Sequence, residues 1–114
     1  MTIKEIAELL DARLLSGEEK KDLEIEVAFA SDLMSDVLTL IDDNVLLITG
    51  LTNTQVLRTA EMSDIQCIIF ARNKVVSEEL IALARENEIA IISCRYSVFK
   101  TCGILYGAGV KAIF

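Results

Sequence analysis

The sequence contains no histidine, no proline and no tryptophan, and its aromatic content is only 5%. The absence of histidine removes the commonest general base and the commonest transition-metal ligand from the possible chemistry. Without proline and without a low-complexity segment, nothing in the chain has the composition of a linker between two domains. We therefore expect residues 1–114 to form one domain, a length near the usual domain size.

Cysteine is scarce and its spacing is not that of a scaffold. The three residues are Cys67, Cys94 and Cys102, and no CxxC pair occurs. The odd count and the missing pair argue against a disulfide framework and against a zinc ribbon. Cys67 and Cys94 lie inside apolar runs, so we expect them to be buried and unreactive.

Long hydrophobic runs and positive charge are also missing. No run approaches the roughly 20 apolar residues that cross a bilayer, and the chain begins with an amphipathic pattern rather than a leader, so a cytoplasmic location is expected. The net charge of −7 opposes binding to nucleic acid or to an anionic membrane. It does not exclude a small anionic ligand held by backbone amides at the start of a helix.

The stretch from Asn44 to Ala60 organises the rest of the chain. Val45 to Ile48 is a short, wholly apolar run, and Thr49-Gly50 interrupts it. Polar residues that can cap a helix follow, and apolar residues then return at helical spacing up to Ala60. This pattern predicts a buried strand that leads through a tight turn into a helix.

The same plan repeats along the chain, with apolar runs at residues 65–70 and 89–92 that are each followed by a helical pattern. The alternation predicts an α/β fold with a mostly parallel sheet, right-handed crossovers and helices on the faces of the sheet. Leu23 to Phe29 alternates apolar and polar residues, as a strand near a sheet edge does. Residues 12–16 and 111–114 are candidates for further short strands.

Each predicted helix starts at a residue whose side chain can cap it. Thr2 and Glu5 have the spacing of a capping box, and Asn53, Ser77 and Ser97 precede later helices. Ser31 or Asp32 is the expected cap of a helix whose apolar side is formed by Leu33, Met34, Val37, Leu38 and Ile41.

Ligands of parallel sheets bind outside the carboxyl ends of the strands. Here that edge comprises residues 30–32, 49–53, 71–73 and 93–97. The candidate ligand site combines the loop after the central strand with two cations on neighbouring loops: Thr49, Gly50, Thr52, Asn53, Arg72 and Arg95. The loop fits neither GxxxxGK[ST] nor GxGxxG, so an ordinary strand-to-helix turn is the alternative interpretation.

The remaining candidate reactive residues, two aspartates and one cysteine, can also be explained by a structural role alone. Asp32 and Asp36 are spaced to hold a divalent cation, but the same spacing fits a capped first helical turn. Cys94 is a conceivable nucleophile that lacks a histidine partner. We therefore expect neither a catalytic residue nor a metal or cofactor.

The order of segments resembles the DRTGG-domain family across nearly the whole chain. The segments that carry the resemblance are IKEIAELLDARLLSG, VAFASDLMSDVL, LLITGLTNTQVLRTAEM and CIIFARNKVVSEELIALARENEIAIIS, with the closing helix. The Asp-Arg pair and the Thr-Gly-Gly that name the family would fall at residues 51–53 and 71–73, and neither is present. The chain therefore resembles a divergent, free-standing member.

The resemblance implies a fold similar to the N-terminal domain of HPr kinase/phosphorylase. It implies a non-catalytic regulatory or protein-interaction module, commonly dimeric, with a partner in a larger complex such as an iron-only hydrogenase system of anaerobes. The alternative is a sensor of an adenine nucleotide or another phosphorylated metabolite. The last helix and Ile113-Phe114 are the expected dimer surface. A domain of this size with 53% hydrophobic residues has more apolar surface than one small core readily buries. Gly103 and Gly107 could admit another helix or could simply mark a helix end.

Overall fold

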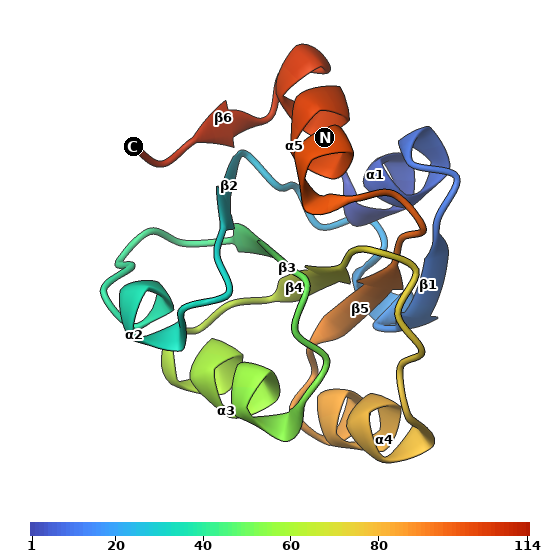
Figure 1. Cartoon of the computed structure of the whole chain (residues 1–114), viewed down its shortest axis with the longest axis vertical. Coiled ribbons are helices and arrows are strands. Elements are labelled where there is room, and N and C mark those ends of the chain that lie inside the picture. Colours follow the sequence, from blue (N-terminus) through green and yellow to red (C-terminus); the bar gives the residue numbers. More distant parts are fainter.

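The computed structural model describes residues 1–114 and contains a six-stranded sheet in the order β1-β5-β4-β3-β2-β6 (Figure 1). All neighbouring strands are parallel except β1 and β5, which are antiparallel. The prediction that the three apolar runs lie side by side in one mostly parallel sheet is confirmed. The strands are β1 (Arg13–Ser16), β2 (Val27–Ala30), β3 (Val45–Thr49), β4 (Cys67–Phe70), β5 (Ala90–Ser93) and β6 (Lys111–Ala112).

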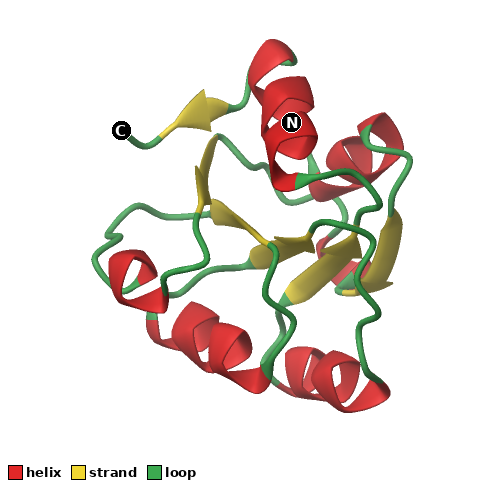
Figure 2. Ribbon diagram, in the orientation of Figure 1, coloured by secondary structure: helices red, strands yellow, loops and turns green.

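Helices cover both faces of the sheet (Figure 2). One face carries α2, α3 and α4, and the opposite face carries α1 and α5. None of these helices is long and apolar enough to cross a membrane. The helices are α1 (Ile3–Leu9), α2 (Met34–Val37), α3 (Thr54–Met62), α4 (Glu78–Glu86) and α5 (Val98–Gly107), and a short 3₁₀ turn spans Glu18–Lys20.

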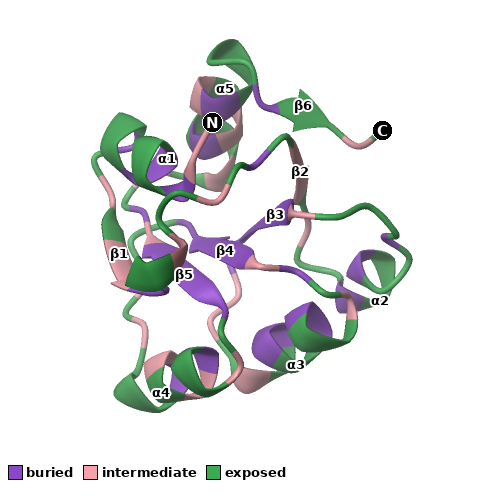
Figure 3. Ribbon diagram, turned by 180° about the vertical axis from the view of Figure 1, so that it is seen from behind, coloured by how far each residue is buried: buried purple, intermediate pink, exposed green.

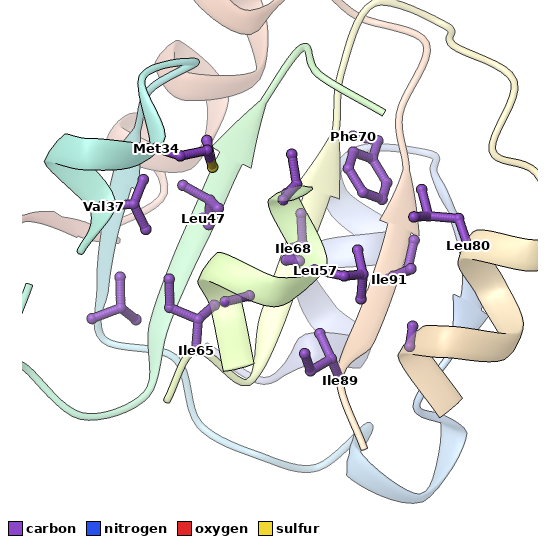
Figure 4. Close-up of a cluster of buried hydrophobic side chains, with 14 of the residues drawn as sticks. Met34, Val37, Leu47, Leu57, Ile65, Ile68, Phe70, Leu80, Ile89 and Ile91 are labelled. Atoms are coloured by element: carbon purple, nitrogen blue, oxygen red, sulfur yellow. The ribbon is translucent and has the colours of Figure 1, made fainter. Parts of the chain in front are cut away.

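The two-faced burial explains why the central strands are continuous apolar runs. Every residue of β3 and β4 is buried (Figure 3). Alternate residues point to opposite faces, so Leu47 and Ile68 join the core beneath α2 to α4 (Figure 4), whereas Leu46 and Cys67 join the core beneath α1 and α5. Cys67 is buried as expected, and burial raises the pKa of its thiol to about 12.

Four of the five helices begin at the expected caps. Thr2 and Glu5 form the complete capping box of α1. The side chains of Asn53, Ser77 and Ser97 accept hydrogen bonds from the third residue of their helices. Because these caps satisfy amides that have no partner inside the helix, the starts of the helices are readable from local sequence.

The region between β2 and β3 differs from the prediction. The expected helix with an apolar side from Leu33 to Ile41 is only the four residues of α2, and no side chain caps it. Met34 and Val37 are buried, but Leu33 is exposed and Ile41 is 94% exposed. Neither Ser31 nor Asp32 caps it, since the hydroxyl of Ser31 accepts from the Leu33 amide in a local turn and Asp32 bonds elsewhere.

The edges of the sheet follow the prediction more closely. The strand expected from Leu23 to Phe29 pairs with β3 only from Val27 onward. Its other side is covered by the two residues of β6, so it lies one strand from the edge. Figure 1 shows that this edge carries the chain end and lies next to α5.

Candidate functional site

The loop between β3 and α3 has the strand-turn-helix form that the sequence predicts. Thr49 ends the buried strand, and its side chain is fully enclosed. Asn53 stands at the start of α3, where its Oδ1 accepts from the Val56 amide at 3.1 Å. Thr52 lies half-buried between them. Thr49, Gly50, Thr52 and Asn53 therefore line one short turn at the carboxyl edge of the sheet.

Two amides of this turn, those of Gly50 and Leu51, are engaged from within the molecule. The Gly50 amide and the Thr49 hydroxyl both donate to Oδ1 of Asp32, each at 2.8 Å. The Leu51 amide donates to the Thr49 hydroxyl oxygen at 3.2 Å. A carboxylate of the chain itself thus occupies the position in which an external anion would meet these donors.

Asp32, which the sequence offered with Ser31 as a possible helix cap, instead bonds to the turn after β3. The hydrogen bonds from Gly50 and Thr49 lower the pKa of Asp32, and the positive charges of Arg72 and Lys74 lower it further. Its position directly after β2 was the available signal, because carboxyl ends of neighbouring parallel strands meet at one edge.

Arg72 is brought to this turn as predicted. A Cβ placed on Gly50 would lie 3.1 Å from Arg72 Cδ and 3.6 Å from both Arg72 Nη1 and Asp32 Oδ2. The two charged side chains therefore flank Gly50, and they leave little room for a side chain at this position. The backbone holds Arg72 in this position at φ 71° while its amide donates to the Tyr96 carbonyl at 2.7 Å.

Arg95 points to a different part of the molecule. Its Nη2 lies 3.0 Å from Oδ2 of Asp11, directly after α1, and its guanidinium carbon lies 5.3 Å from the centre of the Tyr96 ring. Contact with Tyr96 and then the charge of Asp11 raise the pKa of Arg95. Arg72 and Arg95 thus come from neighbouring loops, but only Arg72 lies against the turn.

A crevice would be expected between β4 and β5, because their following helices lie on opposite faces. Backbone hydrogen bonds close it: Arg72 donates to Tyr96, and the Asn73 amide donates to the Cys94 carbonyl at 3.0 Å. None of the four main hollows of the molecule is lined by the candidate residues of this edge. The structure also contains no cluster of three or more side chains able to hold a metal ion.

Comparison with known proteins connects this fold to a family. The sequence model of the DRTGG domain matches residues 5–108. The chain belongs to the DRTGG domain family. The resemblance noted in the sequence is therefore confirmed, although this member lacks the residues that name the family.

A solved structure shows the same fold. It is the crystal structure of the CBS and DRTGG domains of the regulatory region of Clostridium perfringens pyrophosphatase, complexed with the activator diadenosine tetraphosphate. It superposes with a TM-score of 0.75 at 19% identity, over 91% of this chain and 45% of that one. This DRTGG chain thus spans less than half the length of its structural relative. Comparison with curated protein sequences gives no match.

Proposed function

We propose that this DRTGG domain is a non-catalytic regulatory or protein-interaction module, with residues 1–114 acting as one domain that works as a homodimer. The observation that carries the proposal is the match to a family whose solved relative belongs to the regulatory region of an enzyme. Its partner would be a protein of a larger complex, and iron-only hydrogenase systems of anaerobes are the class that the family resemblance suggests.

The state of the reactive side chains supports a role without catalysis. Cys94 is buried, with its sulfur 3.5 Å from the Thr101 hydroxyl oxygen, so its thiol cannot meet a substrate. The Asp32 carboxylate has a lowered pKa and is held by the turn after β3, which makes it a weak general base.

The homodimer is supported by the distribution of apolar side chains. Phe99, Tyr106 and Phe114 are 88%, 72% and 90% exposed, respectively, and all three lie on α5 or in the tail after it. Exposed apolar patches of this kind mark interaction surfaces. Sedimentation velocity at tens of micromolar tests the proposal: a dimer is expected, and a species that remains monomeric at this concentration refutes it.

A second candidate function is a sensor of an adenine nucleotide or another phosphorylated metabolite. The observation that favours it is the convergence of Arg72 on Gly50 at a helix-opening turn. The solved relative, crystallised with diadenosine tetraphosphate, suggests the ligand class. The site would comprise Thr49, Gly50, Thr52, Asn53, Arg72 and Arg95. An anion there would have to displace the Asp32 carboxylate from the turn and draw Arg95 away from Asp11.

A thermal-shift titration with adenine nucleotides tests the sensor. A ligand at about 100 times its dissociation constant stabilises the fold by about 2.7 kcal/mol, which is several degrees for a domain of this size. Gly50→Leu, Arg72→Glu and Arg95→Glu are expected to remove the shift. Arg58→Glu, which makes the same charge change on the exposed side of α3, is the control and should keep it. A full shift in all three site variants would place the ligand elsewhere.

A further inference from the structure

The exposed side of α5 carries an apolar stripe, formed by Phe99, Cys102, Gly103 and Tyr106. The stripe borders a hollow of about 360 Å³ between α5 and the β2–β6 edge, and ten of the twelve residues that line the hollow are hydrophobic. Figure 1 shows α5 and β6 next to each other at this end of the sheet. The two aromatic members are the exposed large hydrophobic residues of the helix.

Gly103 lies in the middle of this stripe, and no contact within the domain requires a glycine at this position. It is exposed, and a Cβ built on it would meet no atom within 4 Å. Glycine inside a helix lowers helix stability by roughly 1 kcal/mol relative to alanine. No part of the same chain uses the space that glycine leaves, so the space is available to another molecule.

The stripe is symmetric about its own middle, with large residues at 99 and 106 and small residues at 102 and 103. Two crossing helices are closest where they cross and diverge on either side. Small residues at the crossing point and large residues beyond it fit this geometry. If a copy of α5 crosses in the antiparallel sense, Phe99 of one copy faces Tyr106 of the other, as a two-fold axis requires.

We propose that the stripe is an isologous contact in which α5 of a second copy crosses α5 at Cys102 and Gly103. The proposal rests on the homodimer of the proposed function and names its surface. A second hollow is lined by both Tyr106 and Phe114, so the tail after α5 extends the surface formed by the stripe. With three exposed aromatic side chains from each copy, at about 150–250 Å² each, the contact would bury about 900–1,500 Å². A biological interface needs about 1,000 Å² in total.

Charge favours a second copy of this acidic chain at this surface. The chain has 18 acidic against 11 basic residues, yet none of the acidic ones lies between Tyr96 and Phe114. The ammonium group of Lys100 sits 4.1 Å from the centre of the Tyr96 ring, which precedes the helix. Two copies can therefore meet through α5 without bringing acidic side chains of this segment together, and like charges at a contact are repulsive.

Sedimentation of matched variants tests the surface. Phe99→Glu is expected to raise the dimer dissociation constant at least 100-fold, and Gly103→Leu at least 10-fold. Val75→Glu is the control, because Val75 is a similarly exposed apolar residue, at 90%, far from α5 in sequence and on the loop before α4. This control should leave the dissociation constant unchanged, and circular dichroism should show all variants folded.

Crosslinking tests the crossing point independently. Cys102 is the one cysteine that is not buried, so a short bismaleimide should join two chains through it in the wild type and not in Cys102→Ser. A dimer that withstands Phe99→Glu and Gly103→Leu and is not crosslinked refutes this surface while leaving the homodimer intact. A wild-type chain that is only monomeric refutes both this surface and the homodimer. The same result is expected if an apolar segment of another protein, rather than a second copy, covers the stripe.

Discussion

Single residues matter most where the chain turns sharply against a buried strand. Gly17 follows β1 with φ 86°, a left-handed conformation that L side chains rarely adopt. A Cβ at this position would lie 2.5 Å from the Cβ and 2.6 Å from the Cα of Ala90, the first residue of β5. Because the Ala90 backbone belongs to the sheet, it cannot move aside without disturbing β5.

Gly17→Ala is therefore expected to reduce the free energy of unfolding by about 2–5 kcal/mol, from the strained φ and the overlap together. Urea denaturation followed by circular dichroism measures it. Gly107→Ala is the matched control, since a Cβ there meets no atom within 4 Å and the position is helical. An equal loss in the control would show that the effect is not specific to Gly17.

Cys67 gives a second prediction at this scale. Burial raises the pKa of its thiol to about 12 from 9.0, so the folded state keeps the proton to higher pH than the unfolded state does. The stabilising contribution is complete below pH 9 and is lost as pH rises toward 12. Denaturation of the wild type and Cys67→Ala should therefore show a stability difference that shrinks above pH 9. Rapid native-state labelling at Cys67 would contradict the burial.

At the scale of elements, the helices differ in how firmly their starts are fixed. α4 has the Ser77 cap and two acidic residues in its first turn, which complement the helix dipole. α2 has no side-chain cap and only four residues. Its loop is instead tied to the neighbouring strand, because Asp32 bonds to the turn after β3. A polar contact between two loops thus replaces local capping between β2 and β3.

Removing the α4 cap tests the local mechanism. Ser77→Ala should lower the free energy of unfolding by about 1 kcal/mol, because the Leu80 amide loses its acceptor. Ser35→Ala, at an exposed position within α2, is the control and should change it by less than about 0.5 kcal/mol. Thermal or urea unfolding of the two variants gives the comparison.

Removing the Asp32 contact tests the replacement mechanism through its pH dependence. The pKa of Asp32 is lower when folded than when unfolded, so its stabilising effect is present at neutral pH and disappears as pH falls through the lowered value. Asp32→Ala should thus destabilise the protein by roughly 1 kcal/mol at pH 7, since the carboxylate is largely exposed to solvent. The difference from wild type should vanish at strongly acidic pH; a difference independent of pH would contradict it.

The whole molecule combines a net charge of −7 with a closing segment, from Tyr96 to Phe114, that has no acidic side chain and exposes three aromatic ones. Its two cores lie on opposite faces of one sheet, and α5 with β6 closes the side at which the aromatic residues remain exposed. A domain of this size gains limited stability from its own core, so association adds to it. For a homodimer this addition depends on concentration.

The melting temperature of the wild type should therefore rise as protein concentration increases from about 1 to 100 μM. Val75→Glu should show the same rise, whereas Phe99→Glu should melt at one temperature throughout. Differential scanning calorimetry at several concentrations makes the measurement. A wild-type melting temperature that does not change with concentration would count against a folded state stabilised by association.

The sequence by itself determined the features that depend on neighbours along the chain. The apolar runs of β3, β4 and β5 specify strands buried on both faces, and local side-chain bonds at Thr2, Asn53, Ser77 and Ser97 start four helices. Period and capping act over at most four residues, so both can be read directly. The segment pattern also indicated the family.

Only the tertiary structure decided which polar groups meet at the carboxyl edge. Asp32 reaches Gly50, Arg95 reaches Asp11, and the loops after β4 and β5 join through backbone hydrogen bonds that close the crevice between them. Each contact joins residues from different loops, and its geometry depends on the strand order and on turns such as that at Arg72. The chain pattern placed these residues on one edge, but their pairing follows from the packed sheet.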